Sequence, residues 1–173
     1  MEDTVYRDLM RHMEWADART WAAALGVPSL QQDPQMRDRL HHYHTTQWAY
    51  LQLWRHEEVT IAQASSFADL KALGQWVRAY YRELPSFLDT VDEAALERRI
   101  TLPWAERLEA RFGKITPATL AENMLQLTLH TAHHRGQAAT KIREAGGAPD
   151  VIDYIAWVWF GRPAPDWASV DAG

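Results

Sequence analysis

Apolar side chains recur every three or four residues along four long stretches of this chain, which is the spacing of helices that bury one face. The stretches are residues 3–25, 34–58 and 66–89, and a fourth that begins at Thr116-Pro117 or at Thr119 and ends at Gly146-Gly147. Helices of this length pack side by side around a shared core. The pattern therefore predicts an all-α fold, a four-helix bundle in which residues 1–173 form a single domain.

The same spacing predicts which side chains point inward. On the first helix they are Val5, Leu9, His12, Ala16, Thr20 and Ala23. On the second they are Met36, Leu40, Tyr43, Gln47, Tyr50 and Trp54. On the third they are Phe67, Leu70, Leu73, Val77, Tyr80, Leu84 and Phe87. On the last they are Leu120, Met124, Leu127, Thr131 and His134.

Local signals place the ends of two of these helices. Ser65 or Ser66 is the expected N-cap of the third helix, and Pro85 should bend or terminate it. Thr119 and Glu122 match a capping box at the start of the last helix. The predicted ends of these two helices thus depend on capping residues and proline, and not on the apolar stripes.

The segments outside the four helices are less regular. Residues 99–104 and 112–115 are expected to be two short extended pieces that pair within a long connection before the last helix. Residues 150–160 form a short, tryptophan-rich helix that either covers one end of the bundle or forms a dimer surface. Gly136 lies inside the last helix, where glycine costs up to about 1 kcal/mol relative to alanine. We therefore expect a backbone of the first or second helix to approach it closely.

Composition narrows the classes of protein and of site. A formal net charge of −5 argues against a general nucleic-acid binder, which needs a basic face for phosphates. No apolar run has the length of a bilayer span and the N-terminus has no signal-peptide core, so we expect a cytoplasmic protein without membrane contact. The chain has no cysteine, so a metal site would have to use His, Asp or Glu.

Two groups of histidines are candidates for such a site. His130 and His134 lie four residues apart, so on a helix both rings leave the same face one turn apart and can bind one metal ion. An isolated pair with this spacing is more often two ordinary, partly buried histidines. The second group, which includes His42 and His44, and the Arg-Gly-Gln that follows His134 favour the metal site. We expect the fold to bring the two groups together.

The spacing leaves several roles open. His42 and His44 flank the inward stripe of the second helix on opposite sides, so periodicity does not choose between them, whereas His41 points closer to solvent. His12 is interpreted as a hydrogen-bonded core histidine outside the site. Asp17 is either an acceptor that holds a metal-bound imidazole or a surface charge, and the surface charge is favoured.

Three stretches together resemble the DinB superfamily, the YfiT-like four-helix bundles. They are Trp15-Ala16-Asp17, Leu40-His41-His42 with Gln47 and Tyr50-Leu51, and the run from His130 to Gln137, HTAHHRGQ. The first is similar to the family's Trp-Ala-Asn/Asp, the second to its pattern on the second helix, and the third to its HxxxHRGQ. The tail, Gly147-Ala148-Pro149-Asp150 with Asp153-Tyr154-Ile155, also fits one branch of the family. The resemblance covers nearly the whole chain.

The resemblance implies a ligand set and a metal. It implies that His42, His130 and His134 bind the ion, with His44 in reserve, and that His133 is not a ligand. Zinc or nickel suits three imidazoles best, and iron or manganese are further candidates. Gln47 stands where relatives often carry an acidic residue. The resemblance also implies a homodimer.

Relatives implied by the resemblance include bacillithiol transferases and mycothiol-dependent maleylpyruvate isomerases. The function expected on this basis is metal-dependent transfer of a low-molecular-weight thiol, or isomerisation, with a small electrophile as substrate in stress response or detoxification. A metal-dependent hydrolase and a non-catalytic metal-binding stress protein are the alternatives. Arg135 could steer the acidic groups of a thiol, or pair with Asp17 or Glu14 and hold the last helix to the first, and the pairing is favoured.

Overall fold

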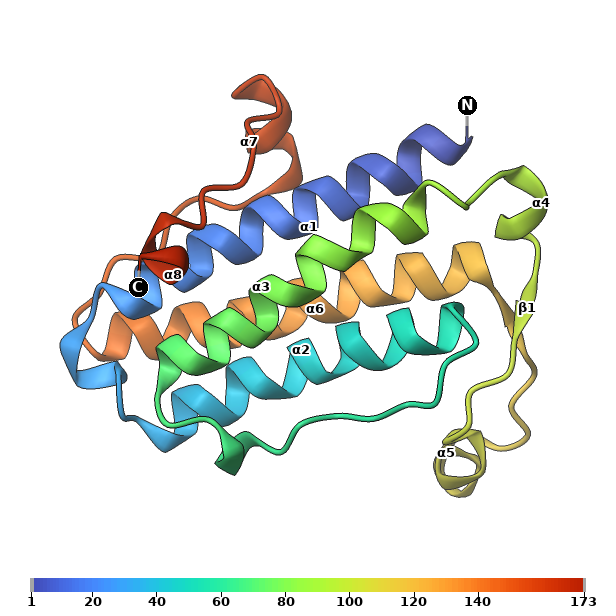
Figure 1. Cartoon of the computed structure of the whole chain (residues 1–173), viewed down its shortest axis with the longest axis horizontal. Helices are drawn as coiled ribbons and strands as arrows, with labels where there is room; N and C mark the ends of the chain where they lie inside the picture. The colour runs from blue at the N-terminus through green and yellow to red at the C-terminus, as the bar shows by residue number, and fades with distance from the viewer. Residues whose placement is uncertain (1, 173) are drawn as a thin grey trace.

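The computed structural model describes residues 2–172, with side chains from residue 5 onward. Four long helices form a bundle, namely α1 (Glu2–Leu25), α2 (Pro34–Trp54), α3 (Leu70–Leu88) and α6 (Leu120–Glu144). α1 and α6 run in one direction and α2 and α3 in the other (Figure 1). α6 packs against both α1 and α2, and α3 packs against both from the other side. The predicted all-α bundle is confirmed.

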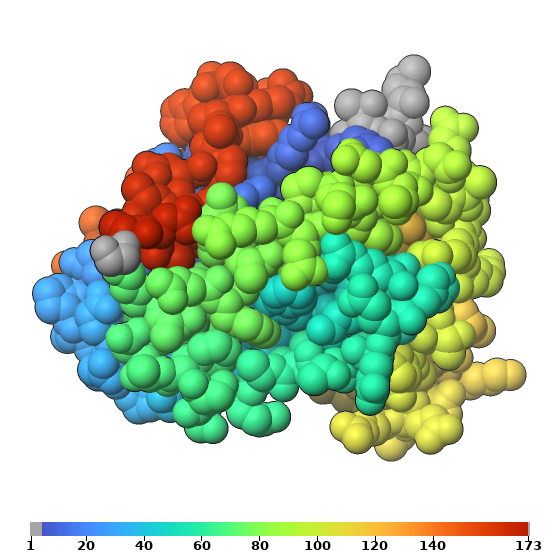
Figure 2. Space-filling view, viewed as in Figure 1, coloured from blue at the N-terminus to red at the C-terminus, as the bar shows by residue number. Residues whose placement is uncertain are grey.

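Short elements occupy the connections between these helices. They are η1 (Pro28–Leu30), η2 (Ala64–Ser66), α4 (Glu93–Leu96), β1 (Arg99–Ile100), α5 (Ala105–Phe112), β2 (Ala118–Thr119), α7 (Tyr154–Trp159) and α8 (Ala168–Asp171). The predicted long connection before the last bundle helix is present at one end of the bundle (Figure 1). The segment between α2 and α3 runs back along α2 and covers it on the face that Figure 2 shows.

The two predicted extended pieces of the long connection are only half correct. Residues 99–100 form β1, as expected, but its antiparallel partner is β2, with Arg99 opposite Thr119. Residues 105–112 form the helix α5, which has four charged and four apolar side chains and was not predicted. The prediction that residues 112–115 pair with the first piece is therefore wrong.

α2 ends at Trp54, four residues before its predicted end. His56 takes a left-handed backbone conformation with φ of 60°. The backbone N–H groups of His56 and Glu57 donate to the carbonyls of Leu53 and Gln52, at 3.1 and 2.9 Å. This is a Schellman motif in which histidine takes the position that glycine usually holds. The helix end was missed because no glycine marks it.

α3 begins later than predicted, at Leu70. The carboxylate of Asp69 accepts the backbone N–H of Ala72 at 2.8 Å, so Asp69 is the N-cap and the prediction of Ser65 or Ser66 is wrong. Pro85 does not terminate the helix, which continues to Leu88. The capping box at the start of α6 is confirmed, with Thr119 and Glu122 exchanging both bonds.

The inward stripes of α2 and α3 are confirmed, except that Phe67 is only half-buried and lies before α3. The predicted stripe of α1 is only partly correct, because His12, Ala16 and Thr20 are buried whereas Leu9 and Ala23 are half-buried. Val5 is 56% exposed, and the side chains that enter the main core from α1 are Met10, Met13, Ala18, Trp21 and Ala24. His12 lies on a second buried flank of α1, where its Nε2 bonds the carbonyl of Ile152 at 2.9 Å. His12 is thus a hydrogen-bonded core histidine, as expected.

α7 packs on the flank of α1 and does not cover an end of the bundle (Figure 1). Trp157 is buried against Trp15 and Ala16, whereas Trp159 and Phe160 are 76% and 60% exposed. The dimer surface predicted for these aromatic side chains, and the homodimer itself, stay predictions. Within residues 2–172, no helix combines the length and hydropathy needed to cross a membrane.

Gly136 is not approached by another backbone. A Cβ atom built at this position would have no atom within 4 Å apart from its own helix backbone and chain neighbours. The prediction that α1 or α2 packs closely on it is wrong. Gly136 instead borders an open hollow that Leu9, Ile152 and Tyr154 also line.

Candidate metal centre

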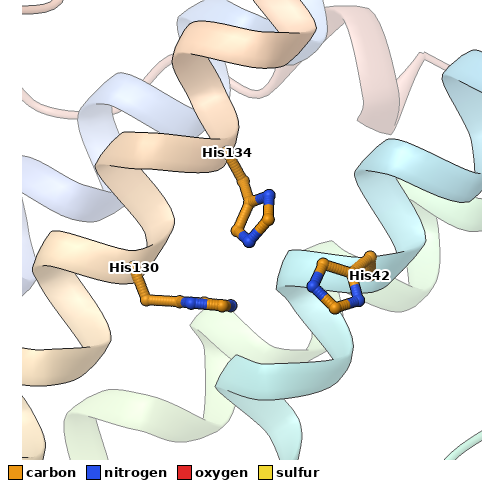
Figure 3. A group of neighbouring side chains, drawn as sticks. All are labelled: His42, His130 and His134. Carbon is orange, nitrogen blue, oxygen red and sulfur yellow. The ribbon is translucent and has the colours of Figure 1, made fainter.

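Three imidazole rings converge between α2 and α6. His42 comes from α2, and His130 and His134 come from successive turns of α6 (Figure 3). One ring nitrogen of each lies within 4.8 Å of those of the other two. The ring centroids of His42 and His134 are 4.6 Å apart, and those of His130 and His134 are 4.4 Å apart. The structure thus brings together the two groups of histidines, as the sequence predicts.

A hydrogen bond sets the orientation of the His134 ring. Its Nδ1 lies 2.9 Å from Oε1 of Gln137, and an amide oxygen can only accept, so Nδ1 carries the proton. The other nitrogen, Nε2, then has a free lone pair and points to the space between the other two rings (Figure 3). Buried or half-buried histidines that bind metals are commonly held in this way. The amide nitrogen of Gln137 in turn donates to His133, which lies outside the group of three.

The other two rings are kept neutral by their surroundings. Burial, followed by the nearby His134, lowers the pKa of His42. The same two causes, with His42 as the next, lower the pKa of His130 to about 4. Protons and metal ions compete for the same nitrogen lone pairs, so a lowered pKa leaves these nitrogens available at neutral pH.

The donor set fits one divalent metal ion. A metal–imidazole bond measures about 2.0–2.1 Å, so an ion between nitrogens no more than 4.8 Å apart is within reach of all three after small side-chain rotations. Three neutral ligands leave the charge of the ion uncompensated and at least one coordination position open. Such an arrangement is typical of a catalytic site and not of a structural one.

His44 is not part of this group. It is fully buried on the side of α2 that faces α1, where Nε1–H of Trp21 donates to its Nε2 at 2.9 Å. Its Nδ1–H donates to Oε1 of Gln47 at 2.6 Å, so both nitrogens have partners. His44 is therefore excluded as the reserve ligand. His41 was predicted to point closer to solvent than His42. In the structure His41 is half-buried and His42 is exposed, so this prediction is wrong.

A buried polar network fixes α2 and α6 relative to the other helices. The carboxylate of Asp17 on α1 accepts from Nη1 of Arg135 at 2.8 Å and from Nε2 of Gln47 at 2.8 Å. The hydroxyl of Tyr81 on α3 also donates to it. Burial and the carboxylate raise the pKa of Tyr81 well above its usual value, so the phenol stays protonated and remains a donor. All four bundle helices thus contribute to one network.

This network lies next to the three imidazoles along the chain. Arg135 follows His134, and Thr131, which follows His130, has its hydroxyl 3.4 Å from Nε2 of Gln47. Residues that adjoin on a helix point in different directions, so the network faces the core while the imidazoles face α2. The network therefore fixes the register in which His42 meets the other two rings.

These contacts decide the roles that the sequence left open. Arg135 pairs with Asp17 and is only 3% exposed, so the favoured pairing that holds the last helix to the first is confirmed. Asp17 is fully buried, and the prediction of a surface charge is wrong. Its partners are Arg135, Gln47 and Tyr81, and in the described part of the chain it holds none of the three imidazoles.

A cavity of about 830 Å³ opens beside the three imidazoles, with His42 and His130 in its wall. α2 and α6 form one side, and the segment after α2, the loop before α5 and α5 itself form the other. The remaining lining residues are Thr45, Thr46, Ala49, Tyr50, Val59, Ile61, Leu102, Trp104, Arg107, Leu108 and Gln126. A small molecule in this cavity would contact the open side of the imidazole group.

Several of these residues were missed from sequence. Thr46 lies four residues after His42 on the same face of α2, and its hydroxyl is 3.2 Å from Nε2 of His130. That spacing is a signal that could have found it. Arg107 and Trp104 lie in the irregular connection, where no periodic pattern indicates which side chains approach the site.

The model of the DinB family matches residues 1–163. No curated protein matches the chain.

Proposed function

The chain belongs to the DinB family, and from this membership and the three convergent imidazoles we propose that it binds one divalent metal ion through His42, His130 and His134. Zinc and nickel suit an all-imidazole donor set best, with iron and manganese as further candidates. An ion bound there would act as a Lewis acid that lowers the pKa of a coordinated water or thiol.

We further propose that the protein is a metal-dependent thiol S-transferase or isomerase that acts on small electrophiles. The single observation that carries this is the position of His42 and His130, two of the three imidazoles, in the wall of an open cavity. In a transfer, the sulfur of a low-molecular-weight thiol forms a bond to an electrophilic carbon. The leaving group departs with the bonding electron pair, and the thiol proton goes to water.

The chain's own residues would bind and orient the reactants. The apolar walls of the cavity would hold the electrophile and exclude water from it. The hydroxyl of Thr46, beside His130, can donate to or accept from a group placed at the open side of the imidazoles. Gln137 keeps His134 in the tautomer that leaves Nε2 unprotonated.

The lining of the cavity favours this function over a hydrolase. A metal-dependent hydrolase generally uses a general base to accept the proton of the attacking water. Among the described residues that line the cavity there is no aspartate or glutamate. The exposed position of His42 and the access from solvent also favour a site that meets small molecules over a closed, assembly-only role.

The test is a transferase assay of the purified, metal-analysed protein with a panel of small thiols and electrophiles. His42→Ala and His134→Ala should lose both the metal and the activity. His133→Ala is the matched control, because His133 is on the same helix and outside the group of three. Equal activity in parent and in both ligand variants would refute a metal-dependent transferase.

A further inference from the structure

Arg107 is an exposed, charged side chain on α5 that lines the cavity and has no side-chain partner among the residues that the structure describes. In the described structure, its guanidinium makes no ion pair or side-chain hydrogen bond. Neighbouring arginines are engaged. Arg98 bonds the carbonyl of Trp54 at 2.9 Å, and Arg111 lies over the Phe112 ring at 5.2 Å. Arg107 is thus a cation at the cavity that is available to a ligand.

The walls near Arg107 are apolar. Val59 and Ile61 come from the segment after α2, and Leu102 and Trp104 precede α5. The Trp104 ring lies edge-on to Tyr50, with centroids 5.9 Å apart, so the aromatic wall is continuous with α2. A ligand pocket of this kind binds a largely apolar body and uses a few polar groups to fix its orientation.

The charges in the cavity have one sign. Arg107 is positive, an ion on the imidazoles would add further positive charge, and the described lining contains no carboxylate. A field of one sign attracts anionic groups of a ligand. A guanidinium matches the two oxygens of a carboxylate with two parallel hydrogen bonds.

We propose that the cavity takes a small substrate with an apolar body and a carboxylate, and that Arg107 binds the carboxylate. The proposal rests on the function proposed above, because that function requires the reactive group of the substrate to lie at the imidazoles. The carboxylate subsite consists of protein groups only. We therefore expect it to bind carboxylates in the absence of metal, so that carboxylate binding can be tested separately from the transferase reaction.

The experiment uses 4-phenylbutyrate and its neutral amide as probes. Both are titrated by calorimetry into metal-free and zinc-loaded full-length protein. The acid should bind the metal-free parent at least 10-fold more tightly than the amide, the size expected for a charge-assisted hydrogen bond. Arg107→Gln should weaken binding of the acid roughly 10-fold and leave the amide unchanged. Arg111→Gln, on the same helix, should behave as the parent does.

The proposal is overturned by any of three results. These are no measurable binding of the acid to the parent, equal binding of the acid to parent and Arg107→Gln, and binding of the acid only when zinc is present. His134→Ala should keep the preference for the acid. If it does while no variant or parent shows transferase activity, the acid subsite stands and the proposed reaction fails.

Discussion

Arg135 and Asp17 form an ion pair inside the bundle, with Nη1 of Arg135 2.8 Å from Oδ1 of Asp17 and both side chains shielded from solvent. The pair joins α6 to α1 one residue after His134. The ion pair adds little net stability, because the cost of removing both charges from water offsets their mutual attraction. Removing one partner, in contrast, leaves the other charge buried and uncompensated.

Asp17→Asn should therefore lower the free energy of unfolding by about 3–5 kcal/mol. Urea unfolding of the metal-free protein measures it. Asp38→Asn is the matched control, because Asp38 forms an exposed pair with Arg37 at 3.7 Å and its loss should change stability by less than about 1 kcal/mol. If both substitutions changed the free energy of unfolding by similar small amounts, the buried network would not be needed to hold the bundle helices together.

Gln137 offers a test of the metal centre that does not touch a ligand. Gln137→Leu removes the acceptor for Nδ1–H of His134 and should weaken metal binding by about 10- to 100-fold. Gln137→Glu keeps an oxygen acceptor and should bind metal at least as tightly as the parent. Calorimetric titration with zinc compares the three proteins. Equal affinities for leucine and glutamate variants would refute the orienting role of Gln137.

The sequence predicts the bundle well because α2 and α3 each have one continuous buried face, which is apolar on α3 and mainly apolar on α2. It does less well for α1, which is buried on two flanks, so that a single stripe does not describe it. Met13 and Trp21 face the main core, whereas Trp15 and Ala16 face α7. Periodicity detects one buried face of a helix. It does not show that a further element covers a second face of the same helix.

The candidate site shows the same limit. The spacing of His130 and His134 is visible in the sequence, but the choice between His42 and His44 depended on family resemblance. The physical reason for the choice is that Trp21 and Gln47 engage both nitrogens of His44, and these partners come together only in the folded chain. The burial of Asp17 was missed for the same reason, since its partners come from three other helices.

Acid should destabilise the metal-free protein in a defined range of pH. Burial lowers the pKa of His44 from 6.5 to about 4 in the folded state. Between these values the unfolded chain binds a proton that the folded chain does not, so stability falls as the pH falls from 6.5 to 4. The loss attributable to His44 is on the order of 3 kcal/mol.

The measurement is the free energy of unfolding in urea at a series of pH values from 7 to 4. His12, His42 and His130 also have lowered pKa values and act in the same direction. A free energy of unfolding that stays constant, or rises, as the pH falls through this range would contradict the assigned buried neutral state of His44.

Two glycines of the chain should respond to alanine in opposite ways. Gly136 is helical and has open space around it, so Gly136→Ala should raise the free energy of unfolding by about 0.5–1 kcal/mol. Gly147→Ala would place a Cβ atom 2.5 Å from Cγ2 of Val27 and should destabilise the protein. Thermal and urea unfolding check both. Destabilisation by Gly136→Ala would contradict the open surroundings of this residue.

The central claim is that three imidazoles from two helices bind one ion, and zinc titration of the metal-free protein tests it most directly. The account predicts one zinc ion per chain for the parent and for His133→Ala, with loss of high-affinity binding in His42→Ala, His130→Ala and His134→Ala. Circular dichroism should show that all of these variants remain helical. Binding of one zinc with parental affinity by any of the three ligand variants would contradict the account.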